Sequence, residues 1–126
     1  MESLLITGGC GFIGSHTCIT LLESGKNLIV IDNNVNSSVE TLRSLRKISQ
    51  KKNIDFSERL IFFKGDIRSR KFLREVFEFA KRNGRNINSV IHFAGLKAVT
   101  ESVNLPINYW SSNVKGSITL FEIMLE

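Results

Sequence analysis

Several features are scarce or missing in this sequence, and each absence excludes a class of protein. The 126 residues contain one Pro and nine Gly, too few for a collagen-like or low-complexity chain. Two Cys without a C-x-x-C pair and two isolated His make neither a disulfide framework nor a zinc site. No apolar run approaches the roughly 20 residues of a membrane helix, and the start of the chain lacks a basic signal segment. We therefore expect a cytoplasmic domain with free thiols and no metal.

The excess of positive charge is confined to the middle of the chain. The formal net charge is +5, and residues 43–85 hold 14 of the 17 basic residues against five of the 12 acidic ones. Basic and apolar residues alternate there at helical spacing, as in residues 71–81, which is typical of the solvent-facing side of an amphipathic helix. Because no aromatic residue is interleaved on the exposed side, we expect neither nucleic acid nor a membrane surface as a partner.

Short apolar runs alternate with amphipathic segments along residues 1–126, which we interpret as one domain. The predicted strands occupy residues 3–7, 27–32, 60–64 and 89–93. The first predicted helix occupies residues 12–24 before Gly25, and the third occupies residues 69–83 before Gly84. The second follows a capping box of Ser37 and Glu40 and runs to about residue 51. The last begins near Pro106 and runs to the end of the sequence. This order predicts an α/β fold, a Rossmann-type doubly wound parallel sheet truncated after about four strands and four helices.

The first predicted strand leads into a glycine cluster at residues 7–14. Gly9, Gly11 and Gly14 fit the pattern G-x-G-x-x-G, and Gly8, Gly11 and Gly14 fit the variant G-x-x-G-x-x-G. Glycine at such positions permits a tight turn, close approach of the backbone to a diphosphate and close packing of helix on strand. With a strand before it and a helix after it, the cluster is typical of a dinucleotide-binding turn.

Polar residues at the ends of the later strands point to the rest of such a site. Asp32 ends the second strand, 18 residues past Gly14, where a carboxylate can bind ribose hydroxyls and repel a 2′-phosphate. This favours NAD over NADP. The alternative is that Asp32 only caps the turn after its strand. Asp66 follows the third strand and either binds the adenine amino group or caps the next helix. Lys97 follows the fourth strand, where it either faces the diphosphate or stays solvated, and His92 is expected to be a core histidine.

Six segments of the chain together resemble the extended short-chain dehydrogenase/reductase superfamily and, within it, the UDP-glucose 4-epimerase family. They are TGGCGFIGSHTC (7–18), DNN-x-NS (32–37), GDIR (65–68), HFAGLKAV-x-ES (92–102), P-x-x-Y (106–109) and NV-x-G (113–116). The resemblance implies an NAD-dependent isomerase of galactose metabolism that interconverts UDP-glucose and UDP-galactose through hydride transfer to NAD and a 4-keto intermediate. It also implies a UDP-sugar substrate and a homodimer.

The resemblance also implies which residues contact the ligands. The cofactor NAD would contact Gly8, Gly11, Phe12, Ile13, Gly14, Asp32, Asn33, Asn36, Ser37, Asp66, Ile67, Phe93, Ala94, Gly95, Lys97 and Asn113. The substrate would border Lys97, Ala98 and Val99. Because Ser112 stands where some relatives carry a second asparagine, the cofactor contact falls to either Ser112 or Asn113.

The catalytic pair of the superfamily, Tyr-x-x-x-Lys, does not occur in this sequence. Tyr109 is the single tyrosine, and Asn113 stands where the lysine would be. We therefore identify no catalytic residue and expect the NAD-binding part of such an enzyme, inactive on its own. Two alternatives remain. One is the same part of a nucleotide-sugar 4,6-dehydratase or UDP-N-acetylglucosamine 4-epimerase, and the other is a non-catalytic NAD-binding or interaction module.

Overall fold

The computed structural model describes residues 1–126 except 36, 39 and 53–55, and in this part of the chain four strands form one sheet. They are β1 (Glu2–Thr7), β2 (Leu28–Asp32), β3 (Leu60–Lys64) and β4 (Asn86–His92). They lie in the order β3-β2-β1-β4, and the three neighbouring pairs are parallel. The predicted α/β fold with a parallel sheet is thus confirmed.

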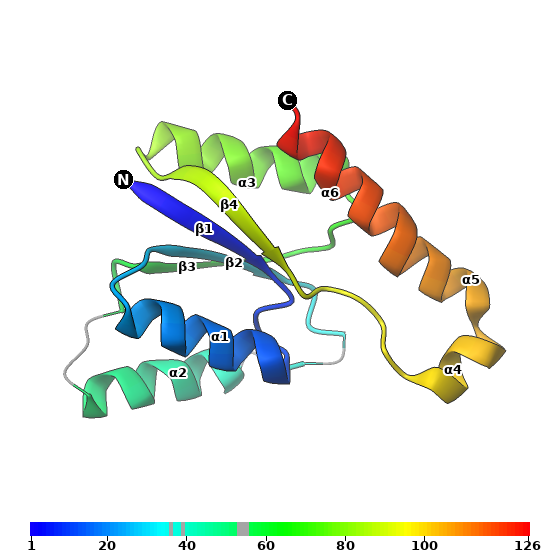
Figure 1. Ribbon diagram of the computed structural model, residues 1–126, viewed down its shortest axis with the longest axis horizontal. Helices are drawn as coiled ribbons and strands as arrows, with labels where there is room; N and C mark the ends of the chain where they lie inside the picture. The colour runs from blue at the N-terminus through cyan, green and yellow to red at the C-terminus, as the bar shows by residue number, and fades with distance from the viewer. Residues whose placement is uncertain (36, 39, 53–55) are drawn as a thin grey trace.

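Helices cover both faces of this sheet, as in a doubly wound fold (Figure 1). They are α1 (Phe12–Glu23), α2 (Glu40–Lys51), α3 (Arg70–Arg82), α4 (Val99–Asn104), α5 (Pro106–Tyr109), the π-helix η1 (Trp110–Lys115) and α6 (Gly116–Met124). The helices α1 and α2 lie on one face, and α3 and α6 on the other (Figure 1). The last three elements follow one another without a break and form a single long helix.

Strand β2 reads as an unbroken apolar run because it is buried on both faces. All five of its residues are buried, and successive side chains point to opposite faces. Ile29 and Ile31 join the core that α3 and α6 cover, whereas Leu28 and Val30 join the core under α1 and α2. The sheet therefore separates two apolar cores.

The structure differs from the sequence-based prediction in three places. The capping box is wrong, because the Ser37 hydroxyl donates to Asp32 and the hydroxyl of Ser38 instead accepts the N–H of Glu40. Strand β4 begins at Asn86, three residues earlier than predicted, because its pairing with β1 continues there across a register shift. The short helix α4 was not predicted at all.

Most basic residues of the middle segment are exposed, as predicted, whereas Arg59 and Arg85 are half-buried. On α3, Arg74 and Arg82 are exposed and form ion pairs with Glu126 and Glu78. Exposed pairs of this kind contribute little to stability, because solvent screens the charges. Among the helices in the described part of the chain, none is long and apolar enough to cross a membrane.

Both cysteines are free and buried, as expected from the sequence. Burial raises the pKa of the Cys10 thiol to about 11, with a further contribution from the charge of Asp32. Burial likewise raises the pKa of Cys18 to about 12. Both side chains are therefore neutral thiols at pH 7 and act as small apolar residues of the core under α1 and α2.

Candidate functional site

A crevice of about 390 Å³ lies at the carboxyl ends of the strands, the edge at which open α/β sheets bind ligands. It brings together the glycine turn after β1, the end of β2, the turn after β3, the loop after β4 and one residue of η1. The lining residues are Gly8, Gly11, Phe12, Ile13, Gly14, Ile31, Asp32, Asn33, Val35, Ser37, Gly65, Asp66, Ile67, Phe93, Ala94, Gly95, Leu96, Lys97, Ala98 and Ser112.

Most residues that we predicted to contact a ligand line this one crevice. Asn36 lies outside the described residues. Asn113 does not belong to the lining, whereas its neighbour Ser112 does. Val99, predicted to border a substrate, begins α4 and is 81% exposed beyond the crevice.

Sequence reasoning missed a few lining residues that are next to predicted ones. Gly65 precedes Asp66, and Leu96 lies between two predicted residues of the loop after β4. Ile31 and Val35 flank the predicted end of β2. These residues could have been predicted from their position next to predicted ones, because a loop that lines a crevice does so over several consecutive residues.

The glycine turn is packed too tightly for side chains at several positions. Gly8 has a φ of 69°, and a Cβ there would lie 2.6 Å from the backbone nitrogen of Ala94. A Cβ on Gly14 would lie 2.3 Å from the Gly8 carbonyl oxygen, which also accepts the N–H of Gly11 at 3.1 Å. Glycine is therefore required both by the left-handed backbone and by the close packing of α1 on the turn.

Helix α1 begins directly after this turn, and no side chain caps its N-terminus. Its N-cap residue is Gly11, which has no side chain to satisfy the first N–H groups, and the first turn contains no acidic residue. These N–H groups lack partners within the helix and carry the positive end of its dipole. The start of α1, where Phe12 and Ile13 are largely exposed, is therefore suited to a phosphate group.

The carboxylate of Asp32 is oriented by three donors. It accepts the backbone N–H of Cys10 at 2.9 Å, the backbone N–H of Asn34 at 2.8 Å and the hydroxyl of Ser37 at 3.1 Å. The residue is 9% exposed. A carboxylate offers about four acceptor positions, so one position remains for a hydroxyl group of a ligand in the crevice.

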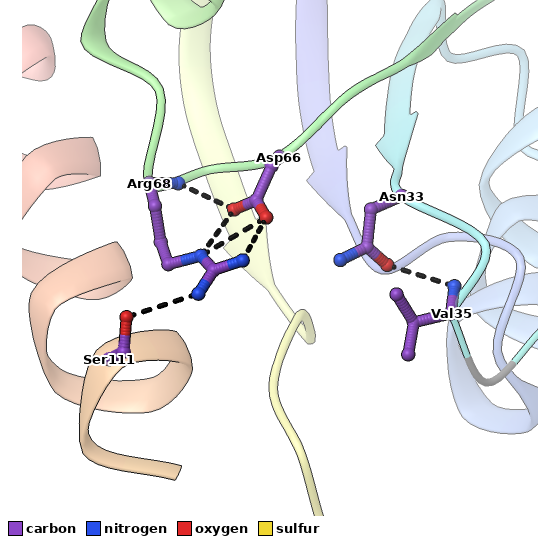
Figure 2. A network of polar contacts seen from close by, with 5 residues as sticks. All are labelled: Asn33, Val35, Asp66, Arg68 and Ser111. Atoms are coloured by element: carbon purple, nitrogen blue, oxygen red, sulfur yellow. Dashed lines mark hydrogen bonds and ion pairs between the residues drawn. The ribbon is translucent and has the colours of Figure 1, made fainter. Parts of the chain in front are cut away.

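A second carboxylate, Asp66, is held by Arg68 in the turn after β3 (Figure 2). Arg68 donates to both carboxylate oxygens, from Nη2 at 2.7 Å and from Nε at 3.1 Å, and its Nη1 reaches Ser111 on η1 at 3.1 Å. The Arg68 guanidinium lowers the pKa of Asp66. The amide nitrogen of Asn33 points toward the same carboxylate in Figure 2.

The structure excludes one of the two roles considered for Asp66. The hydroxyl of Ser69 accepts the N–H of Phe72 and is the N-cap of α3, so Asp66 does not cap this helix. Asp66 is instead a charged residue of the crevice lining.

The loop after β4 contributes a positively charged side chain, Lys97, to the crevice lining. The Lys97 ammonium donates to the Phe93 carbonyl at 2.9 Å and lies among the lining residues. His92 just before it is half-buried and bonded through both ring nitrogens, to Thr7 and Ser117, as expected of a core histidine. Burial, and then the charge of Lys97, lower the pKa of His92.

Three comparisons with known proteins agree with this architecture. A protein-family model described as GDP-mannose 4,6 dehydratase matches residues 5–126. The UDP-glucose 4-epimerase of Yersinia enterocolitica is 52% identical over 122 residues, which are 97% of this chain and 33% of that protein. The solved structure of UDP-glucose 4-epimerase from Bifidobacterium longum, in complex with NAD+ and UDP, has a TM-score of 0.83 and 38% identity over 99% of this chain and 33% of that one.

Another solved structure is similar at lower identity. The UDP-Glc/GlcNAc 4-epimerase of Campylobacter jejuni has a TM-score of 0.82 and 27% identity, over 99% of this chain and 34% of that one. The chain thus spans about a third of the length of the relatives that it matches.

Proposed function

The chain belongs to the family described as GDP-mannose 4,6 dehydratase, and we propose that its crevice binds NAD as the cofactor-binding part of a nucleotide-sugar 4-epimerase. One observation carries the proposal: the uncapped N-terminus of α1 and the oriented carboxylate of Asp32 line the same crevice. A dinucleotide needs both an anion site for its diphosphate and an acceptor for its ribose hydroxyls.

The crevice offers a partner for the adenosine and for the diphosphate of NAD. The adenosine ribose would bind the free acceptor position of Asp32, and a second hydroxyl can replace the Ser37 hydroxyl on that carboxylate. The adenine would lie toward Asp66 and Ile67. The diphosphate would lie against the start of α1, opposite the ammonium group of Lys97. A 2′-phosphate would meet the charge of Asp32, so NAD should bind more tightly than NADP.

Bound NAD would supply a hydride acceptor that takes the hydrogen from the sugar C4 and returns it to the other face. This chain would contribute binding and orientation, with Lys97, Ala98 and Val99 bordering the substrate. We propose that the whole enzyme interconverts UDP-glucose and UDP-galactose in the cytoplasm as a homodimer. The proteins named UDP-glucose 4-epimerase among its relatives support this choice. Without a Tyr-x-x-x-Lys pair, the 126-residue chain should be inactive alone.

Two features support a nucleotide-sugar 4,6-dehydratase or a UDP-N-acetylglucosamine 4-epimerase as the second candidate. The family description names a 4,6-dehydratase, and the Campylobacter jejuni relative is described as acting on both UDP-Glc and UDP-GlcNAc. All of these candidates require the same NAD crevice. A non-catalytic module that used its basic residues to hold an acidic partner would instead bind polyanions with strong salt dependence, independently of NAD.

Calorimetric titration of the 126-residue chain with NAD and, in parallel, with NADP tests the proposal. We expect saturable binding of NAD, weaker binding of NADP, and about tenfold weaker NAD binding by Asp32→Asn, because a hydrogen bond to a charged group contributes about 1.5–3 kcal/mol. Glu40→Gln is the matched control, since it makes the same chemical change at an exposed position at the start of α2.

Two results would contradict the proposal. One is the absence of NAD binding by a wild-type chain whose circular dichroism shows it to be folded. The other is an unchanged NAD affinity in a folded Asp32→Asn variant, which would show that the Asp32 carboxylate does not bind the ribose.

A further inference from the structure

One face of the long helix α5–η1–α6 contacts the chain segment between the end of β4 and the start of α4. Residues 93–98 of this segment line the crevice, and we call the segment the wall. Tyr109, Asn113 and Ser117 recur every four residues along this helix and contact, in turn, Ala98, Leu96 and His92. We call these three helical residues the polar stripe. The contacts run in opposite order along the two segments, so the stripe follows the whole wall from the end of β4 to the start of α4.

Asn113 satisfies both backbone groups of one loop residue. Its Oδ1 accepts the N–H of Leu96 at 2.7 Å, and its Nδ2 donates to the Leu96 carbonyl at 2.9 Å. The neighbouring Gly95 packs against the same amide, since a Cβ on that glycine would lie 3.0 Å from Asn113 Oδ1. The Asn113 amide thus satisfies the N–H and the carbonyl of Leu96, as a neighbouring strand would in a sheet.

Tyr109 contacts both backbone groups of Ala98, which lies two residues further along the loop. Its hydroxyl accepts the N–H of Ala98 at 3.1 Å, and lies 2.9 Å from the Ala98 carbonyl and 3.2 Å from the Glu101 carboxylate, either of which it can donate to. Asn113 and Tyr109 therefore fix the backbone on both sides of Lys97. The amine of that lysine, in turn, is bonded to the Phe93 carbonyl on the same wall.

Ser117 extends the stripe to β4 through a consistent set of donors. The Ser117 hydroxyl donates to the carbonyl of Asn113 at 2.5 Å, so it accepts the Nε2–H of His92 at 2.9 Å. His92 Nδ1 is then an acceptor for the hydroxyl of Thr7, whose oxygen accepts the N–H of Ala94 at 3.1 Å. The wall is thus bonded to the helix on one side and to the end of β1 on the other.

We propose that Tyr109 and Asn113 are positioning residues for the dinucleotide. They hold the backbone of residues 96–98 so that Lys97 and the loop face the diphosphate and nicotinamide half of NAD, and Asn113 acts through Leu96 without touching the cofactor. The inference rests on the proposed function. Without the two side chains the loop would sample several conformations, and binding would incur the entropy of ordering it.

The test compares NAD with AMP, which lacks the half of the dinucleotide that the loop would face. We expect Asn113→Ala and Tyr109→Phe each to weaken NAD binding about tenfold in calorimetry while changing AMP binding less than about twofold. Asn108→Ala and Trp110→Phe are the matched controls, because both side chains are exposed on the same helix, and neither should change either affinity. A merely structural loss would weaken NAD and AMP by the same factor and would overturn the inference.

Amide hydrogen exchange, followed by NMR without ligand, tests the clamps independently of cofactor binding. The Leu96 amide should exchange slowly in the wild-type chain and at least about tenfold faster in Asn113→Ala, and the Ala98 amide should respond in the same way to Tyr109→Phe. Unprotected amides in the wild-type chain would overturn the inference. A wild-type chain that bound neither NAD nor AMP would instead contradict the proposed function, and the exchange rates would still decide whether the clamps exist.

Discussion

The substitution Gly8→Ala places a methyl group where three backbone atoms already lie. The added Cβ would be 2.6, 2.8 and 2.9 Å from the nitrogen of Ala94, the carbonyl carbon of Phe93 and the Cα of Ala94. Because these are main-chain atoms, no side-chain rotation can relieve the overlap. The loop after β4 would have to move away from the end of β1, and the hydrogen bond from the Ala94 N–H to Thr7 would be stretched or lost.

A matched control separates the two costs of this substitution. Gly84 has a φ of 64°, close to the 69° of Gly8, but a Cβ there would meet nothing within 4 Å. Gly84→Ala therefore carries only the left-handed strain of about 1–2 kcal/mol, reduced by about 0.4–1 kcal/mol because alanine restricts the unfolded chain. Gly8→Ala adds overpacking of about 1–3 kcal/mol and a weakened hydrogen bond of about 1 kcal/mol.

We therefore expect Gly84→Ala to lower the free energy of unfolding by about 1 kcal/mol and Gly8→Ala to lower it by about 3 kcal/mol or more. Urea denaturation followed by far-ultraviolet circular dichroism measures both, with the slope m checked for constancy. If the two variants lost the same free energy, the close contact between the glycine turn and the loop after β4 would not exist in solution.

Two further predictions concern pH. Burial lowers the pKa of His92 in the folded chain. When the pH falls below about 6.5, this histidine therefore takes up a proton in the unfolded chain while it stays neutral in the folded chain. The free energy of unfolding should therefore decrease below that pH, and His92→Gln should flatten this part of a urea-denaturation pH profile; an identical profile in the variant would contradict it. The Asp66 pKa is lowered by Arg68, so Arg68→Met should raise it toward its ordinary value near 4 and remove stability that the wild-type chain keeps until the pH falls through the lowered pKa. NMR titration of the carboxyl carbons measures this pKa, and an unchanged value would refute the assigned pairing.

The parts of the fold that local sequence determines were predicted well. The run at residues 28–31 carries its own signal, because a strand that is buried on both faces is apolar along its length. The run at residues 60–63 is apolar as well, although its side chains are only partly buried at the edge of the sheet. The glycine turn was predictable for a similar reason, since Gly8 and Gly14 occupy positions that exclude a side chain. Once the strands were placed in parallel, their carboxyl ends had to share one edge, which brought Asp32 and Asp66 together at one crevice.

The elements that the sequence did not predict depend on distant contacts. The six residues of α4 include no buried side chain, so no apolar periodicity marks the helix. Ser37 was assigned to a capping box because of its spacing from Glu40, but its hydroxyl instead binds the buried carboxylate of Asp32. A pattern of spacing cannot show which of two acceptors a hydroxyl will meet when one of them comes from the preceding strand.

The π-helix η1 shows most clearly how the site depends on tertiary contacts. Its three consecutive residues Ser111, Ser112 and Asn113 bind Arg68, line the crevice and bind Leu96, respectively. In an α-helix, three consecutive side chains spread over more than half a turn. The wider turn of a π-helix, with its i→i+5 bonds, reduces the angle between successive residues and lets all three face the crevice side. No propensity favours this geometry, so the contacts to the turn after β3 and the loop after β4 must select it. The same contacts connect the turn after β3 to the loop after β4 through one helix.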